Sequence, residues 1–300
     1  LQLSKRWATG RLKECSAVVA PGGLLRPVTG GVYSAGASML DDARAELQGG
    51  HASNLGCALA SDIAGQYGCP AFIADPVSVD EFGPLARYSG HPAIERRSLS
   101  HALSIHAAAR RAAAELGLPL DQTSFVIGHL GGGISVAAVR GGSIIDVNDA
   151  ASDGPFSPER TGGLPLQPLL SLLDSGRYTV PDLRAMVMGR GGLVAYLGTN
   201  SAIEVERRIA AGDATAREVY CAMAYQIAKE IGAMSTVHNG AVDAIVLTGG
   251  VARSTILTSW IEERVRFIAR VLLYPGEDEI RSLVEAALRV LRGEEHVKEY

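Results

Sequence analysis

Three consecutive glycines, Gly131 to Gly133, constrain this chain more than any other feature of its sequence. Their N–H groups can approach a ligand with no side chain in the way, and phosphate is the natural ligand of such a backbone nest. The triplet lies between strand-like stretches at 124–127 and 134–139, and a turn at 141–142 leads to a third stretch at 143–147. A Walker loop instead joins a strand to a helix and needs Gly-Lys-Ser/Thr. On the triplet alone, a phosphate site and a hairpin without a ligand stay equally open.

A stiff loop downstream favours the phosphate site. Residues 154–160 include two prolines, which exclude a helix there, and the loop ends in Arg160. A lone arginine in a loop is more often a solvated surface residue. A rigidly held guanidinium that closely follows a phosphate-type nest, however, suits a transferring phosphoryl group.

The composition excludes several other classes of protein. A chain of 300 residues can form two domains with cores of their own. It has no run of 18 apolar residues, so no membrane span is expected, and its net charge of −4 argues against a general nucleic-acid binder. The four cysteines form no Cys-x-x-Cys pair and no cluster with histidine. They indicate reduced thiols in a cytoplasmic protein without a zinc site.

Strand-like and helical stretches alternate along the chain, which predicts an α/β fold. Helices are expected over 38–47, 51–67, 98–116, 181–188 and 214–238, and further strands over 17–19, 71–73 and 244–247. Asp213 and Ser254 precede helical stretches and are expected to cap them.

Many motifs, in order, resemble the butyrate kinase family. They are residues 50–56, 129–134, 146–150, 154–160, 191–200, 222–235, 247–250, 275–277 and 287–295, and the likeness runs from about Ala17 to the end. The resemblance implies a two-lobed α/β fold of the actin and hexokinase type, which is ribonuclease H-like. It implies that residues 1–120 are the remainder of the first lobe, on the acyl substrate side, and that residues 121–275 form the second, nucleotide lobe. Residues 276–300 would be a helical segment that packs back on the first lobe.

The resemblance also implies a reaction: ATP and butanoate give butanoyl phosphate and ADP, reversibly, with Mg²⁺ accompanying ATP. A kinase for a branched or shorter acid, isobutanoate or propanoate, stays open, as does a non-catalytic remnant that binds nucleotide. The expected partners are ATP or ADP and a short-chain carboxylate or acyl phosphate, without nucleic acid or membrane. A homo-oligomer is also expected.

The family likeness assigns roles to particular residues. The residues implied in catalysis are Asp75, which would also hold Mg²⁺, His101, which would support the transferring phosphoryl group, and Arg160, which would stabilise its charge. The residues implied in nucleotide or phosphate binding are His129, Gly131, Gly132, Gly133, Thr248, Gly249 and Gly250.

Taken without the likeness, several of these residues keep ordinary explanations. Asp75 precedes a proline, which extends its backbone at the end of a predicted strand, but an aspartate there is more often a turn former. A helix surface or core position is the commoner place for His101. Glu277 and Glu279 suit a solvated helix start nearly as well as a metal site.

Two features depart from the family pattern. Where butyrate kinases usually read Val-Val-Gly-Arg-Gly-Gly, this chain reads Val-Val-Ala-Pro-Gly-Gly, so Pro21 replaces an arginine, and only Arg26 is nearby to compensate. The family's opening Asn-Pro-Gly-Ser-Thr-Ser turn, its first phosphate loop, has no counterpart here. We therefore expect a fragment whose first lobe is incomplete at its N-terminus.

Overall fold

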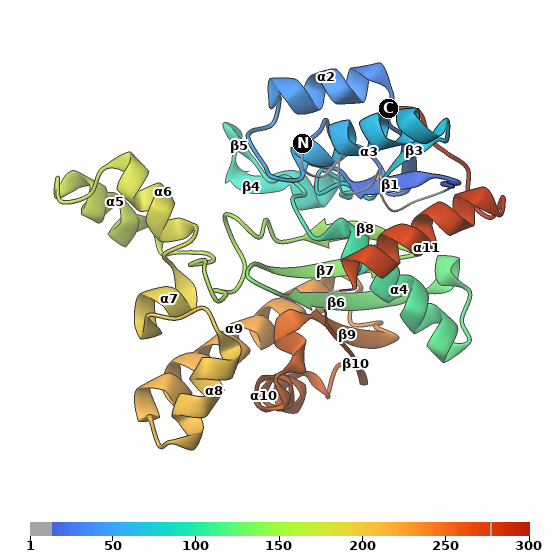
Figure 1. Cartoon of the computed structure of the whole chain (residues 1–300). Helices are drawn as coiled ribbons and strands as arrows, with labels where there is room; N and C mark the ends of the chain where they lie inside the picture. Colours follow the sequence, from blue (N-terminus) through green and yellow to red (C-terminus); the bar gives the residue numbers. More distant parts are fainter. Residues whose placement is uncertain (1–13, 277) are drawn as a thin grey trace. The chain divides into compact units, whose positions relative to one another are not determined.

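The computed structural model describes residues 14–276 and 278–300, which form two compact α/β units (Figure 1). The first unit contains the described residues up to Glu81, together with Ser100–Ala107 and Asp278–Tyr300. The second contains Phe82–Leu99 and the described residues from Ala108 to Gly276. These units differ in extent from the lobes expected from the sequence, because residues 82–99 and 108–120 group with the second unit. The assignment of the lobes to acyl and nucleotide sides stays a prediction.

The described residues form strands and helices that are mixed along the chain. The helices are α2 (Ala37–Ala45), α3 (Asn54–Tyr67), α4 (Ala102–Leu116), α5 (Leu166–Asp174), α6 (Val180–Val187), α7 (Gly192–Leu197), α8 (Ala202–Ala210), α9 (Ala214–Val237), α10 (Thr255–Val265) and α11 (Glu279–Leu291). The strands are β1 (Val18–Pro21), β2 (Val32–Ser34), β3 (Ala71–Ala74), β4 (Tyr88–His91), β5 (Ile94–Glu95), β6 (Ser124–Leu130), β7 (Ile134–Arg140), β8 (Ser143–Val147), β9 (Ala244–Gly249) and β10 (Val271–Pro275). Short 3₁₀ turns are η1 (Pro84–Arg87), η2 (Leu120–Gln122) and η3 (Gly250–Arg253). No helix of the described residues is long and apolar enough to cross a membrane.

The first unit is built on a three-stranded sheet in the order β1-β3-β2. Strand β3 is parallel to β1 and antiparallel to β2. Because side chains alternate along a strand, Ile73 packs with α2 and α3 on one face, whereas Phe72 and Ala74 pack with α11 and the start of α4 on the other. Apolar residues therefore cover both faces of β3 and fix the position of its carboxyl end, which Asp75 follows.

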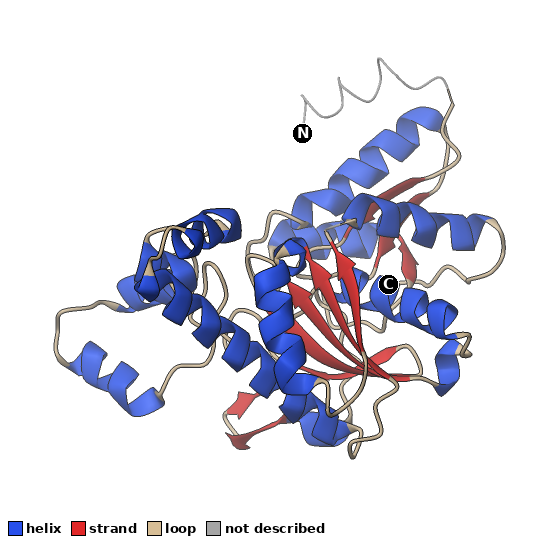
Figure 2. Ribbon diagram, turned by 90° about the horizontal axis from the view of Figure 1, so that it is seen from below, coloured by secondary structure: helices blue, strands red, loops and turns tan. Residues whose placement is uncertain are grey.

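The second unit is built on a five-stranded mixed sheet in the order β10-β9-β6-β7-β8. Figure 2 shows strands of this sheet lying side by side. Strands β10, β9 and β6 are parallel, and β7 and β8 continue as antiparallel hairpins. Helices α9 and α10 bury their apolar residues against one face of this sheet. Figure 1 shows α5 and α6 extending from the rest of this unit, and neither helix has a buried residue.

The sequence predicted most of these elements, and the structure confirms the α/β class. Asp213 and Ser254 cap α9 and α10 as expected, each accepting a backbone N–H bond through its side chain. Two predicted helices begin later than expected. Helix α3 begins at Asn54, after a turn, and α4 begins at Ala102. The N–H of Ser100, just before α4, donates to the carbonyl of Val77, 3.4 Å away.

The end of β9 requires glycine because it passes directly against the end of β6. Gly249 has φ +92°, in the region that disfavours other residues, and a Cβ there would lie 2.4 Å from the carbonyl oxygen of Leu130. Gly240, after α9, has a similar φ of +79°, but a Cβ there would meet nothing within 4 Å. An alanine would therefore have a strained backbone at either position, but it would clash with a neighbouring atom only at Gly249.

We predict that Gly249→Ala destabilises the protein more than Gly240→Ala. Strain at positive φ costs about 1–3 kcal/mol at either position, and only Gly249→Ala must also displace the Leu130 carbonyl. Urea unfolding of both variants measures the difference. Equal losses of unfolding free energy would show that the ends of β6 and β9 separate without cost.

Candidate active site

The two glycine segments singled out in the sequence follow neighbouring strands of the second unit. Strands β6 and β9 are parallel and pair His129 with Thr248. Parallel strands end at the same edge of a sheet, so Gly131–Gly133 and Gly249–Gly250 emerge side by side. Ligands of open α/β sheets bind at the carboxyl ends of the strands. This edge is therefore the candidate phosphate site of the second unit.

Arg160 lies directly against the glycine triplet. A Cβ on Gly133 would be 2.3 Å from Nη1 of Arg160, so only glycine leaves room for the guanidinium. Nη1 donates to the carbonyl of Ala150 at 2.9 Å, which fixes the side chain. Burial lowers the pKa of Arg160, while the carboxylates of Glu159 and Asp149 act in the opposite direction. A partly desolvated guanidinium beside glycine backbone is suited to an anion. Within the triplet, the N–H of Gly131 donates to the carbonyl of Gly133 at 3.1 Å.

Ser157 ties the proline-containing loop to the glycine triplet. Its hydroxyl donates to the carbonyl of Gly132 at 2.5 Å and accepts the N–H of Arg160 at 3.1 Å. Its own N–H donates to the carbonyl of Arg160 at 3.0 Å. The loop and the triplet are thus joined by hydrogen bonds, and the loop is not helical, as its prolines led us to expect.

The remaining predicted residues of the second unit lie within or just after the strands. Thr248 and Gly249 are the last residues of β9, and Gly250 begins η3 rather than the helix α10. His129 lies in β6 between Ser135 and Thr248 on the neighbouring strands, and it is 3% exposed. Its contact with phosphate and the contact of residues 248–250 with adenosine stay predictions.

A half-buried carboxylate near the Arg160 loop was missed in the sequence. Asp153 immediately precedes the loop that carries Arg160, and its Oδ1 has no hydrogen-bond partner among the described residues. Burial raises the pKa of Asp153 to about 6; Arg96 lowers it, and Asp149 and Asp146 raise it further. Burial also raises the pKa of Glu230 on α9, with Asp153 as the next cause. Carboxyl groups perturbed in this way are typical of functional sites. The sequence feature that could have identified Asp153 was the pair of aspartates, Asp149 and Asp153, between β8 and the proline-containing loop at 154–160.

Asp75 occupies a strained position at the end of β3 in the first unit. It is 4% exposed and has φ +39°, which is uncommon for a residue other than glycine. Its N–H donates to the carbonyl of Gly31 at 3.0 Å, and the N–H of Gly31 donates to its Oδ1 at 2.7 Å. These two bonds hold the strained backbone and one carboxylate oxygen together.

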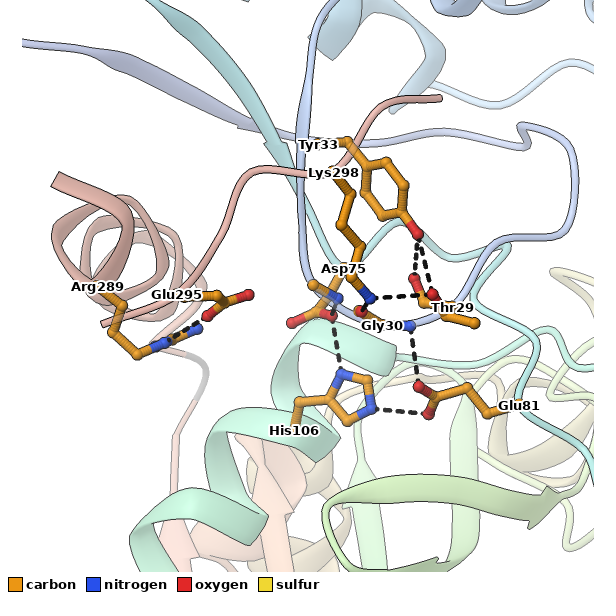
Figure 3. Close-up of polar contacts among 10 residues, drawn as sticks. Thr29, Gly30, Tyr33, Asp75, Glu81, His106, Arg289, Glu295 and Lys298 are labelled. Carbon is orange, nitrogen blue, oxygen red and sulfur yellow. Dashed lines mark hydrogen bonds and ion pairs between the residues drawn. The ribbon is translucent and has the colours of Figure 1, made fainter. Parts of the chain in front are cut away.

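His106 and Glu81 complete a buried network with Asp75, and the sequence reading missed both (Figure 3). The Nδ1 of His106 lies 2.8 Å from Oδ1 of Asp75, and its Nε2 lies 3.3 Å from Oε2 of Glu81. Burial lowers the pKa of His106, but the carboxylates of Asp75 and Glu81 outweigh it and raise the pKa to about 9. His106 is buried with Ala102, Ala109 and other alanines of α4. The sequence feature that could have pointed to it was its place on this alanine-rich face of the helix.

His101, which falls within the helix expected over 98–116, lies immediately before α4. It is half-buried, and its carbonyl accepts the N–H of Ile105 at 3.0 Å, which forms the first turn of the helix. His101 and Asp75 belong to the first unit, and the other predicted site residues belong to the second. Glu279 is exposed at the start of α11, and Glu277 lies outside the described residues.

Arg26 does not take the place of the arginine that Pro21 replaces. Pro21 ends β1, where it pairs with Ala74 of β3. Arg26 forms an ion pair with Asp42, with Nε 2.5 Å from Oδ2, and its guanidinium lies 5.2 Å from the ring centre of Tyr300. Its side chain is therefore already engaged on the surface of the first unit.

Comparison with known proteins gives one consistent relationship. The sequence model of the Acetokinase family matches residues 87–265. A probable butyrate kinase of Listeria innocua is 51% identical over 290 residues, which are 96% of this chain and 82% of that protein. Probable butyrate kinase 2 of Caldanaerobacter subterraneus is 50% identical over 290 residues, covering 97% of this chain and 82% of that protein.

Solved structures share the fold at low sequence identity. The acetate kinase of Porphyromonas gingivalis is 18% identical with a TM-score of 0.83, over 94% of this chain and 80% of that one. A propionate kinase of Francisella tularensis is also 18% identical, with a TM-score of 0.75, over 89% of this chain and 78% of that one. At this identity the likeness concerns the fold alone.

We predict that Asp153→Asn stabilises the protein at pH 8. The pKa of Asp153 is raised to about 6 in the folded state, so folding disfavours the charged form and the native charge costs stability above that pH. The asparagine removes this cost, which is worth about 1–3 kcal/mol. The gain shrinks as the pH falls through 6 and vanishes below the ordinary aspartate pKa, where both states are protonated.

Urea unfolding at pH 8 and pH 5 tests this prediction, with Asp174→Asn as the control at an exposed aspartate. Equal unfolding free energies of Asp153→Asn and the wild type at pH 8 would contradict it.

Proposed function

This chain belongs to the Acetokinase family, and we propose that it transfers the γ-phosphoryl group of ATP reversibly to butanoate. It is a phosphotransferase with a carboxyl group as acceptor. The finer parts of the proposal are the identity of the acid, the roles of individual residues and the use of Mg²⁺.

The observation that best supports this proposal is the position of Arg160 against Gly133. The backbone N–H groups of the glycine segment supply donors for phosphate oxygens, and the guanidinium supplies a positive charge next to them. In the proposal, Gly131–Gly133 and Thr248–Gly250 hold the nucleotide, His129 contacts phosphate and Arg160 stabilises the charge that is spread over the transferring group.

The chemistry needs little beyond positioning. A carboxylate oxygen of the acid forms a bond to the γ-phosphorus while the bond from that phosphorus to the β–γ bridging oxygen breaks, and the electron pair leaves with ADP. The carboxylate is already a nucleophile, so no general base is required. Catalysis then consists of alignment and of neutralising the equatorial oxygens, and His101 is proposed to support the phosphoryl group.

Asp75 fits a Mg²⁺ ion that arrives with nucleotide. Among residues 14–276 and 278–300, no group of three or more His, Cys, Asp and Glu could hold a metal. Mg²⁺ commonly takes one or two carboxylates with phosphate oxygens and waters. A single buried carboxylate suits that arrangement, and the bound ion would neutralise phosphate charge. Asp75 is proposed to orient it.

The choice of butanoate rests on relatives named probable butyrate kinases at 50–51% identity. One methylene changes the energy of an apolar pocket by only about 1–3 kcal/mol, so related acids are realistic competitors. The family likeness further supports the proposals of a cytoplasmic location and of a homo-oligomer.

A hydroxamate assay for acyl phosphate tests the reaction and the substrate together. Protein expressed from the complete gene is given ATP, Mg²⁺ and equal concentrations of butanoate, propanoate or isobutanoate. We expect the highest kcat/KM with butanoate. A preference for isobutanoate or propanoate would replace the substrate. ADP binding without any acyl phosphate would indicate a nucleotide-binding protein without catalysis.

We predict that Arg160→Ala lowers kcat by about 10³–10⁵-fold with little change in the affinity for ATP, because arginines of this kind act mostly in the transition state. The same assay with calorimetric ATP titration measures both quantities. Arg177→Ala, at an exposed arginine between α5 and α6, is the control. An unchanged kcat with a raised KM for ATP would instead assign Arg160 to ground-state binding.

A further inference from the structure

The Asp75 carboxylate is held from several directions within the first unit. Its Oδ1 accepts the N–H of Gly31 at 2.7 Å and lies 2.8 Å from Nδ1 of His106. Its backbone has φ +39°, and such strain persists only where the surroundings fix the residue. The strained backbone lowers the stability of the folded protein, and it accompanies a single fixed orientation of the Asp75 side chain.

The imidazole of His106 is itself confined. The residue is 3% exposed, and its two ring nitrogens face one carboxylate each, Asp75 at 2.8 Å and Glu81 at 3.3 Å. A Cβ on Gly30 would lie 2.3 Å from Cε1 of the ring, so the bare backbone of Gly30 closes the remaining side. Rotation of the ring would break both contacts or strike this backbone.

The C-terminal segment fixes the backbone that closes this side. The N–H of Gly30 donates to Oε1 of Glu81 at 2.9 Å, and its carbonyl accepts from Nζ of Lys298 (Figure 3). Lys298 also donates to Oγ1 of Thr29 at 3.0 Å, and its backbone N–H donates to the carbonyl of Val32 at 2.8 Å. Glu81 thus binds both the ring and the loop beside it, which makes His106, Glu81 and Gly30 one support.

We propose that His106 is a positioning residue that fixes the Asp75 carboxylate for the Mg²⁺–nucleotide complex. This inference rests on the proposed role of Asp75. His106 contacts neither nucleotide nor acid in this proposal; it acts by holding one carboxylate oxygen while Glu81 and Gly30 hold the ring. Groups that orient a metal-binding carboxylate typically contribute about 10–100-fold to metal affinity or activity.

Two substitutions separate the contacts of the ring. In His106→Asn the amide nitrogen takes the approximate place of Nδ1 and keeps the bond to Asp75. In His106→Gln it takes the approximate place of Nε2 and keeps the bond to Glu81. The account expects His106→Gln to lose about 10–100-fold in kcat and about as much in affinity for Mn²⁺ in the presence of ADP, measured by electron paramagnetic resonance. It expects His106→Asn to retain most of the kcat and most of the affinity for Mn²⁺. The KM for ATP is expected to change little in either variant.

His238→Gln and Asp75→Asn serve as controls. His238 is also 3% exposed but lies in the second unit, so its variant reports the effect of replacing a buried histidine. If Asp75→Asn leaves kcat and Mn²⁺ affinity unchanged, the proposed function of Asp75 fails. If Asp75→Asn abolishes activity but both His106 variants keep wild-type values, Asp75 stands and the positioning role of His106 is overturned. Equal losses in the Asn and Gln variants would also overturn it, because the bond to Asp75 would not matter.

Gly30→Ala provides a second route to the same question if the His106 variants melt far below the wild type. The new methyl group displaces the ring while every polar group stays, so the account expects the same loss of kcat and Mn²⁺ affinity as in His106→Gln. A Gly30→Ala protein with wild-type values would overturn the inference.

Discussion

The parallel pairing of β6 with β9 is the interaction on which the candidate nucleotide site depends. The ladder places His129 opposite Thr248, so two glycine segments distant in sequence emerge at one edge of the sheet. Gly249 lets the two strand ends touch, because its missing side chain leaves space for the carbonyl of Leu130. The sheet must also bury an apolar face, and helices α9 and α10 cover that face. A shift of one residue in this pairing would move donors for phosphate away from one another and turn core side chains outward.

The two units present complementary chemistry. The second offers backbone N–H groups and the guanidinium of Arg160, which suit an anion; the first offers the Asp75 carboxylate, which suits a hard cation. Both arrangements cost stability. Arg160 and Asp153 are partly desolvated, and Asp75 has a strained backbone. Costs of this kind collect at functional sites, where the charge or the strain contributes to the chemistry. The buried histidine that contacts Asp75 follows the same principle, since two carboxylates are brought near one imidazole in a desolvated site.

Local patterns in the sequence predicted the local structure well. A helix was expected over 214–238 and α9 covers nearly the same residues, and the caps of α9 and α10 followed from side-chain chemistry. The contact of Arg160 with Gly133 was expected only in outline, because it depends on how a loop folds back over 27 residues of chain. The Asp75–His106 pair was missed because the two residues are 31 positions apart and are joined only by tertiary packing. No periodicity distinguishes a histidine that binds a carboxylate from one that fills a core, so the buried face of α4 alone could not identify His106 as a partner of Asp75.

Hydrogen–deuterium exchange with and without Mg²⁺ and ADP is the most direct test of the central claim, that one edge of the five-stranded sheet binds nucleotide. The account predicts slower exchange in peptides that cover Gly131–Gly133 and Gly249–Gly250, because their N–H groups would donate to phosphate or be shielded by the nucleotide. It predicts no change at the Gly141–Gly142 turn, which lies at the other end of β6 because Arg140 pairs with Ser124. Saturating ADP that leaves both glycine segments unprotected would contradict the account.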